Sequence, residues 1–115
     1  MTPILYGIKA CDTMKKARDW LDQHGVAYQF HDYKLVGIGK DRLQAWVDEM
    51  GWALVLNRAG TTFRKLPESA RQDLDAAAAI ALMLAQPSMI KRPVLDIGTQ
   101  RLLGFKPDLY AKALL

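Results

Sequence analysis

Cysteine is nearly absent from the sequence, since Cys11 is the single cysteine among 115 residues. One thiol cannot form an intramolecular disulfide, which excludes the disulfide-stapled scaffolds of exported proteins. Long apolar runs are also missing, because the longest, at residues 76–85, is too short to cross a bilayer. The N-terminal stretch MTPILYG shows neither a basic region nor a signal-peptide cleavage pattern. These features predict a cytoplasmic protein that does not bind membranes.

Other site motifs are sparse as well. The 16 Lys and Arg exceed the 12 Asp and Glu by four, but no run of five like charges occurs and aromatic residues do not alternate with basic ones. This pattern gives no indication of a nucleic-acid interface. His24 and His31 lack metal-ligand spacing, and GIG at residues 37–39 lacks the third glycine of a dinucleotide motif. We expect no metal, no bound cofactor and no nucleic-acid partner.

The hydrophobic pattern predicts an α/β sandwich with a mixed sheet of about four strands, within the size of one domain. Short apolar runs bounded by Gly or Pro predict strands, and apolar residues at three- and four-residue spacing predict helices. The predicted strands are residues 4–6, residues 26–33 and the hairpin arms PVLDI and QRLLGF; the predicted helices begin at Asp12, Asp41, Leu74 and Pro107, and residues 57–67 are predicted to be irregular.

Cys11 lies where the first predicted strand turns into the first predicted helix. A thiolate attacks and a thiol does not, and the free N–H groups of a helix N-terminus or a nearby cation lower a thiol pKa. Lys9 and Lys15 are close to Cys11 in sequence. The local pattern leaves two interpretations open: an activated nucleophile and a buried structural cysteine.

The segment KRP at residues 91–93 is a second candidate. Pro93 has no N–H and suits the first residue of a strand, and a cis Arg92–Pro93 bond would bring the backbone at Arg92 beside the cysteine loop. The Arg92 guanidinium has the fork geometry that binds oxyanions and carboxylates. A surface arginine ahead of a turn is the alternative.

Three stretches together resemble the superfamily of arsenate reductases (ArsC) and Spx-like proteins, most closely its small YffB-like branch. They are YGIKACDTMKKARDWLDQHGVAYQFHDY, NRAGTTFRKL and IKRPVL with the later FKP, in the family's order over nearly the whole chain. The resemblance implies one thioredoxin-like domain over residues 1–115 with a helical insertion at about residues 40–87. It further implies a catalytic cysteine at the start of the first helix and a cis proline at the start of the third strand.

The resemblance also assigns roles to individual residues. Cys11 matches the nucleophile, and Arg58 matches an arginine that helps to bind the oxyanion in arsenate reductases. Arg92 with Pro93 matches the arginine–proline pair beside the active site. Lys106 stands where arsenate reductases usually have a further arginine, so it keeps the charge but loses bidentate geometry.

Two departures from the family bear on the mechanism. Asp12 and Thr13 follow the cysteine, in place of the NPxCGxS-like loop of arsenate reductases. Met14 stands where Spx-like regulators carry a second cysteine. Because the chain has no second thiol, an external thiol must release any intermediate formed on Cys11, and glutathione is the abundant cytosolic donor.

We therefore expect a glutathione-dependent thiol reductase that acts on an oxidised small-molecule or protein thiol and is a monomer. Glutaredoxin-coupled arsenate reduction is one alternative, and a non-enzymatic Spx-like regulator that binds RNA polymerase is the other. The residues predicted to bind substrate or glutathione are Lys9, Lys15, Arg58, Arg64, Arg92, Pro93 and Lys106.

Overall fold

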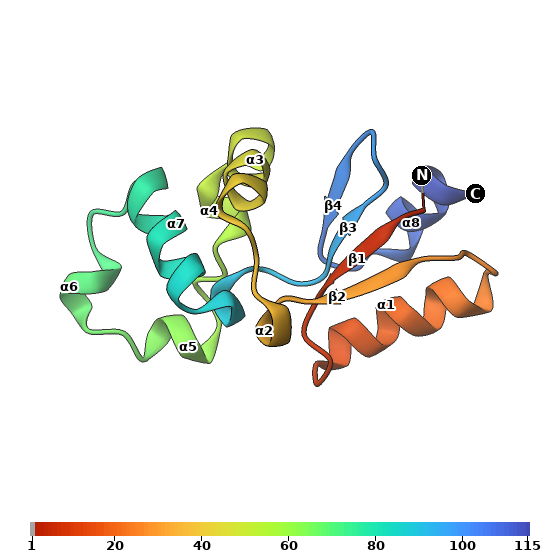
Figure 1. Cartoon of the computed structure of the whole chain (residues 1–115). Coiled ribbons are helices and arrows are strands. Elements are labelled where there is room, and N and C mark those ends of the chain that lie inside the picture. Colours follow the sequence, from red (N-terminus) through yellow and green to blue (C-terminus); the bar gives the residue numbers. More distant parts are fainter. Residues whose placement is uncertain (1) are drawn as a thin grey trace. The chain divides into compact units, whose positions relative to one another are not determined.

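The computed structural model describes residues 2–115, which divide into two compact units (Figure 1). Unit 1 combines the N-terminal residues up to Val36 with Arg92–Leu115, and unit 2 is Gly37–Lys91. The helical insertion predicted at about residues 40–87 falls within unit 2. The assignment of the chain to one domain stays a prediction.

Unit 1 is built on a mixed sheet. Its elements are β1 (Ile4–Gly7), α1 (Asp12–Gln23), β2 (Gln29–Asp32), α2 (Tyr33–Val36), β3 (Val94–Asp96), β4 (Arg101–Leu103) and α8 (Pro107–Leu114). Within the described residues the sheet has four strands in the order β2-β1-β3-β4. β1 is parallel to β2, with Leu5 opposite Phe30, and β3 is antiparallel to both β1 and β4. The predicted mixed four-stranded α/β fold is confirmed.

α1 packs against one face of this sheet (Figure 1). Its buried residues recur at three- and four-residue spacing, as the sequence predicted. α8 packs beside it, and the rings of Trp20 and Tyr110 meet edge-on with their centroids 5.6 Å apart. Burial of apolar surface is the main force that fixes α1 against the strands. The buried residues of this core are Leu5, Met14, Ala17, Leu21, Leu95 and Tyr110.

The second strand, Gln29–Asp32, both begins later and ends earlier than the predicted residues 26–33. It stops at Asp32 because the Asp32 carboxylate accepts hydrogen bonds from the N–H groups of Lys34 (2.9 Å) and Leu35 (3.2 Å), which begins α2 at once. Tyr33 therefore leaves the sheet for α2, and its side chain is fully buried.

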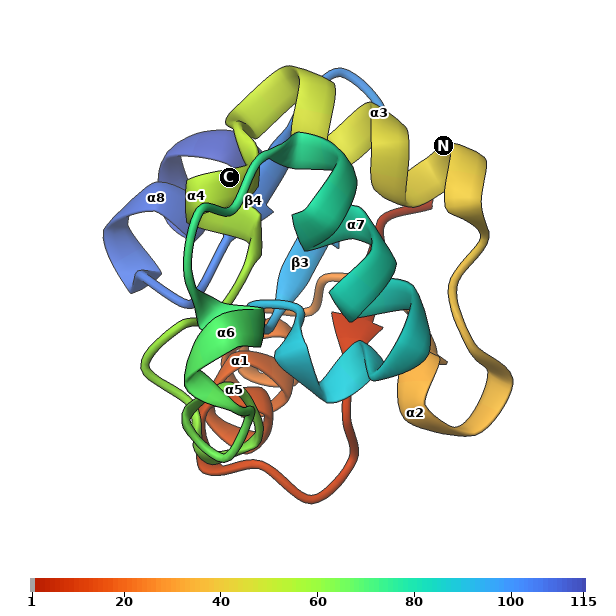
Figure 2. The ribbon, with the colours of Figure 1, turned by 90° about the vertical axis from the view of Figure 1, so that its left-hand side faces the viewer.

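Unit 2 is helical, and Figure 2 shows its helices from a second direction. They are α3 (Lys40–Met50), α4 (Trp52–Val55), α5 (Thr61–Arg64), α6 (Glu68–Arg71), α7 (Ala76–Ala85) and the 3-10 helix η1 (Pro87–Met89). The largely apolar α7 contacts α3, α4 and η1. Its all-round apolar sequence predicts burial, but only one side is buried, at Ala79, Ile80 and Met83, and the small Ala77, Ala81 and Ala85 are exposed. No helix within residues 2–115 is both long and apolar enough to cross a membrane.

Two sequence predictions in unit 2 were wrong. Gly39 is the N-cap of α3, and Asp41, the predicted cap, lies in the first turn, where a carboxylate interacts favourably with the helix dipole. Residues 57–67 were predicted to be irregular, but they contain the short helix α5, which begins after Gly60. One turn is too short to give a periodic hydrophobic signal.

Gly7, the last residue of β1, has no room for a side chain. A Cβ atom here would clash with Sδ of Met14, whose side chain is fully buried. We predict that Gly7→Ala lowers the free energy of unfolding by about 1–3 kcal/mol through overpacking, as measured by urea denaturation. In a Met14→Ala background the same substitution should cost less than about 1 kcal/mol. Equal costs in both backgrounds would show that Met14 is not the obstacle.

Candidate active site at Cys11

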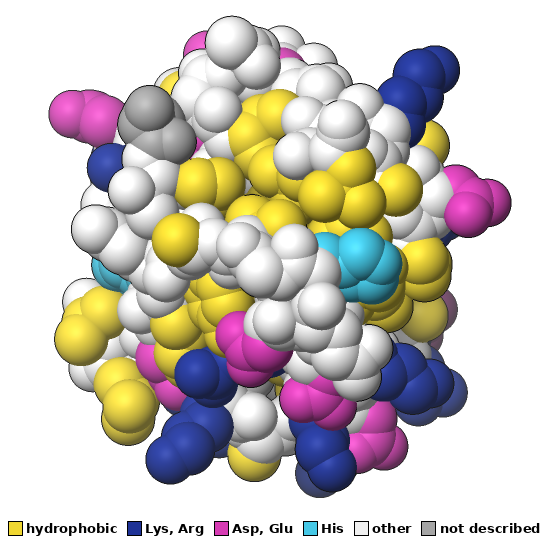
Figure 3. Space-filling model, turned by 90° about the vertical axis from the view of Figure 1, so that its right-hand side faces the viewer, with side chains coloured by type: hydrophobic (Ala, Val, Ile, Leu, Met, Phe, Trp, Pro, Cys, Tyr) yellow, Lys and Arg dark blue, Asp and Glu magenta, His cyan; other side chains and the backbone are white. Residues whose placement is uncertain are grey.

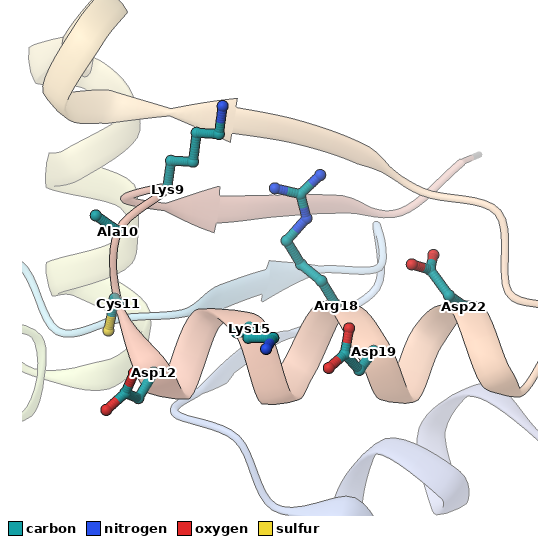
Figure 4. A pocket seen from close by; sticks show the side chains of 8 residues that line it. All are labelled: Lys9, Ala10, Cys11, Asp12, Lys15, Arg18, Asp19 and Asp22. Atoms are coloured by element: carbon teal, nitrogen blue, oxygen red, sulfur yellow. The ribbon is translucent and has the colours of Figure 1, made fainter.

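Cys11 is the N-cap of α1 and follows directly on the loop that leaves β1 (Figure 4). Its backbone is extended, and its carbonyl accepts a hydrogen bond from the Lys15 N–H at 3.0 Å, which begins the helix. N–H groups of the first helical turn have no acceptor within the helix. Those of Thr13 and Met14 lie near the Cys11 sulfur and lower the pKa of its thiol, although the Cys11 side chain makes no cap hydrogen bond in the structure. The local fold thus supplies two backbone donors to one sulfur.

Arg92, two residues before the first residue of β3, brings a positive charge to the same sulfur. Its guanidinium is placed to donate a hydrogen bond to the Cys11 thiolate. The Arg92–Pro93 peptide bond is cis, as the resemblance implied, and Pro93 is buried. The structure therefore brings together the two leading candidates from the sequence, although they are 81 positions apart in the chain.

Opposing effects set the pKa of the Cys11 thiol. Partial burial is the largest and raises the pKa. Hydrogen bonds from the Met14 N–H, the Arg92 guanidinium and the Thr13 N–H lower it, and so does the positive charge of Arg92. The lowering effects together prevail, so the pKa of Cys11 lies below its ordinary value. This supports the interpretation of Cys11 as an activated nucleophile.

A pocket of about 670 Å³ opens beside Cys11 along α1 (Figure 4). Lys9 and Lys15, both predicted to serve the site, are exposed and line it. Arg18 lines it too and was missed. Its Nε donates to the Tyr28 hydroxyl at 3.2 Å, and its guanidinium lies 4.4 Å from the centroid of the Phe30 ring. The pocket is lined by Lys9, Ala10, Cys11, Asp12, Lys15, Arg18, Asp19 and Asp22.

The lining residues on α1 follow a pattern that was visible in the sequence. Cys11, Lys15, Arg18 and Asp22 are separated by four, three and four residues, which places them on one face of a helix. In Figure 3, Lys and Arg side chains are interspersed with Asp and Glu side chains along the lower part of the face shown. The pocket lining itself contains Lys and Arg as well as Asp side chains, so it offers charges of both signs to a ligand.

Three predicted site residues lie elsewhere in the chain. Lys106 is the exposed N-cap of α8 and lines a different pocket, with Phe105 and Leu109 among its neighbours. Arg58 and Arg64 belong to unit 2. The Arg58 guanidinium lies 5.6 Å from the centroid of the Trp52 ring, and Arg64 is the last residue of α5. The roles predicted for these three residues stay predictions.

The histidines make local contacts. His24 Nδ1 lies 2.8 Å from the Trp20 carbonyl oxygen, and the two rings stack with centroids 4.0 Å apart. The centroid of the His31 ring lies 4.8 Å from that of Tyr6. Among residues 2–115, no three His, Cys, Asp or Glu side chains are grouped so as to hold a metal ion.

Two further residues next to the site escaped the sequence analysis. Asp32 accepts a hydrogen bond from the Lys9 N–H at 3.2 Å, so it ties β2 to the loop that precedes Cys11. Burial raises the pKa of Tyr33, and the nearby positive charge of Arg92 lowers it. Both were read as part of an alternating strand, and nothing in that alternation indicates that Asp32 starts a helix.

Comparison with known proteins identifies the family. A model of the ArsC family matches residues 6–113. The chain belongs to the ArsC family. The solved structure of a YffB (PA3664) protein is 69% identical with a TM-score of 0.96, covering 99% of this chain and 100% of that one. An arsenate reductase (ArsC) related protein from Brucella melitensis is 54% identical with a TM-score of 0.80, covering 100% and 97%.

The likeness extends to transcriptional regulators. The global transcriptional regulator Spx of Streptococcus mutans is 27% identical over 101 residues, which is 86% of this chain and 73% of that protein. The predicted membership of the ArsC and Spx-like superfamily, the YffB-like character and the thioredoxin-like fold are therefore confirmed.

Arg92 should control the reactivity of the thiol. We predict that Arg92→Gln slows alkylation of Cys11 by iodoacetamide about tenfold at about pH 6.5 and moves the rate profile to higher pH, because a nearby opposite charge is lost. Lys91→Gln removes an exposed neighbouring charge and is the matched control. Equal rates in Arg92→Gln and the unmodified protein would show that Arg92 does not stabilise the thiolate.

Proposed function

We propose that this ArsC-family protein is a glutathione-dependent thiol reductase that uses Cys11 as its nucleophile and an external thiol to resolve the intermediate. One observation carries the proposal: Cys11 has a lowered thiol pKa, but Met14, three residues later, has no thiol that could resolve a disulfide formed on Cys11. Met14, at the position of a second cysteine in Spx-like regulators, is fully buried in the core. Family membership supports thiol-based reduction in general.

The reaction proceeds through two thiol–disulfide exchanges. The Cys11 thiolate attacks the glutathione sulfur of a mixed disulfide, forms a disulfide with glutathione and releases the substrate as a thiolate, which takes up a proton. A second glutathione thiolate then attacks the glutathione sulfur bound to Cys11. Oxidised glutathione leaves and the Cys11 thiolate is restored. In sum, one mixed disulfide and one reduced glutathione give the free substrate thiol and one oxidised glutathione, in which one half comes from the mixed disulfide and the other from the glutathione consumed.

The residues around Cys11 have separate tasks in these exchanges. Arg92 and the first-turn N–H groups stabilise the thiolate, both as the attacking group and as the leaving group. Lys9 and Lys15 attract the carboxylates of glutathione into the pocket. The backbone beside Pro93 holds the extended peptide of glutathione. We place the reaction in the cytoplasm, where glutathione is abundant, and take the protein to act as a monomer.

Arsenate reduction is the second candidate, favoured by the 54% identity to an arsenate reductase (ArsC) related protein. In that reaction the Cys11 thiolate attacks arsenate, and glutaredoxin with glutathione supplies the reducing thiols. Lys106 weakens this candidate, because a lysine cannot bind an oxyanion in bidentate fashion. A regulator without enzymatic activity is the third, on the likeness to Spx.

Turnover assays with the purified protein separate these candidates. With glutathione and a glutathione mixed disulfide, we expect production of oxidised glutathione, measured by coupling to NADPH oxidation through glutathione reductase. Cys11→Ser should reduce turnover to the uncatalysed rate, because the hydroxyl is not ionised at neutral pH. Lys16→Ser, which changes an exposed residue of α1 outside the pocket, is the matched control.

Two results would contradict the proposal. Turnover that survives Cys11→Ser would exclude Cys11 as the nucleophile. Turnover with arsenate and glutaredoxin, but none with the mixed disulfide, would establish the arsenate reductase instead.

When glutathione is limiting, mass spectrometry should detect one glutathione bound per chain, at Cys11. In the same assays, Arg58→Ala, Arg64→Ala and Lys106→Ala test the roles predicted for those residues.

A further inference from the structure

We infer that Arg18 and Asp22 form a subsite for the γ-glutamyl end of glutathione, in which Arg18 binds the carboxylate and Asp22 the ammonium group of that end. The inference deepens the proposed function and rests on it, because it takes glutathione as the ligand of the pocket beside Cys11. Both residues line this pocket, and both also line a second cavity of about 480 Å³, together with Tyr28 and Phe30. All of these residues belong to unit 1.

Arg18 is held on two sides in an orientation that suits the binding of a carboxylate. It is half-buried, its Nε donates to the Tyr28 hydroxyl at 3.2 Å, and its Cζ lies 4.4 Å from the centroid of the Phe30 ring. Within residues 2–115, the two terminal nitrogens of its guanidinium have no hydrogen-bond or ion-pair partner. Two such nitrogens bind one carboxylate through parallel N–H···O bonds, and less entropy is lost when the fork is already oriented. Arg18 therefore offers a preoriented site for one carboxylate.

Asp22 adds a negative charge one helical turn beyond Arg18. The two residues are four positions apart in α1 and share one face of the helix, and in Figure 4 their side chains point to the same side of α1. Asp22 is exposed, and among the described residues no ion pair joins it to Arg18 or to another cation. Each of the two charges can therefore bind an opposite charge on a ligand. An α-amino acid head group, with its carboxylate and ammonium on one carbon, matches this pair.

The spacing along α1 matches the length of glutathione. Arg18 is seven residues after Cys11, which is about 10 Å along a helix axis. The γ-glutamyl carboxylate carbon of glutathione is eight bonds from the sulfur, so this arm spans about 10 Å when extended. The glycine carboxylate carbon is six bonds away and reaches about 7 Å. With the glutathione sulfur bound to Cys11, the γ-glutamyl arm is therefore the one that can extend along α1 to Arg18.

The test compares mixed disulfides, each with 2-mercaptoethanol, that carry different parts of glutathione. γ-Glutamylcysteine keeps the γ-glutamyl head group, whereas cysteinylglycine keeps the glycine carboxylate and lacks that head group. We expect Arg18→Gln to lower kcat/KM about tenfold with the mixed disulfides of glutathione and γ-glutamylcysteine, because a charge-assisted bond to the carboxylate is lost. With cysteinylglycine the loss should be less than about twofold, which also shows that the variant is folded. Lys16→Gln changes an exposed cation of α1 outside the pocket and is the matched control.

Asp22→Asn tests the ammonium half of the subsite. It should lower kcat/KM about threefold with the mixed disulfide of γ-glutamylcysteine. It should have no effect with that of N-glutarylcysteine, which keeps the terminal carboxylate but lacks the ammonium group. Arg18→Gln should lower kcat/KM with both. Equal effects of Asp22→Asn on the two disulfides would overturn the role of Asp22.

Binding of S-methylglutathione, which cannot form a disulfide with Cys11, tests the subsite apart from turnover. In isothermal titration calorimetry its Kd should rise about tenfold in Arg18→Gln and stay unchanged in Lys16→Gln. The subsite would be overturned by no measurable binding to the unmodified protein, by a Kd that Arg18→Gln leaves unchanged, or by an equal loss of kcat/KM with all three mixed disulfides. The proposed function fails separately: absence of turnover with every mixed disulfide overturns the reductase, whereas turnover that does not depend on Arg18 overturns only the subsite.

Discussion

The stabilisation of one partly buried thiolate at the N-terminus of α1 is the interaction on which the rest of the site depends. Burial alone would keep Cys11 protonated, and it is opposed by the N–H groups of Thr13 and Met14 and by the Arg92 guanidinium. The fold delivers these donors through two constraints. The apolar core fixes α1 against β1 and β3, and the polypeptide returns Arg92 to the start of β3, beside the helix.

Met14, whose backbone N–H is one of these donors, also limits the reactions that Cys11 can complete without an external thiol. The backbone N–H of Met14 faces the thiolate, whereas its side chain fills the core and leaves no space for a Cβ at Gly7. The position that holds a second thiol in Spx-like regulators is thus occupied by core packing in this protein. A single activated cysteine without a neighbouring thiol requires an external reductant, which links the packing of β1 against α1 to the proposed use of glutathione.

Local sequence signals predicted much of the fold and part of the site. The strand before Cys11, the periodic helix after it and the hairpin between β3 and β4 were correct because short-range patterns determine them. The junction at Asp32 was missed because a side-chain cap overrides the alternation of a strand. Tyr33 was missed because its place near Arg92, 59 positions away in the sequence, is a long-range proximity that no local pattern reports.

The ionisation of Cys11 tests the central claim most directly. The ultraviolet absorbance of the thiolate, recorded against pH as the difference between the unmodified protein and Cys11→Ser, reports this one group. The account predicts a single absorbance step with a midpoint below that of an ordinary cysteine, which is about 8.5. A midpoint at or above that value would show that the donors around Cys11 do not overcome its burial, and would contradict the account.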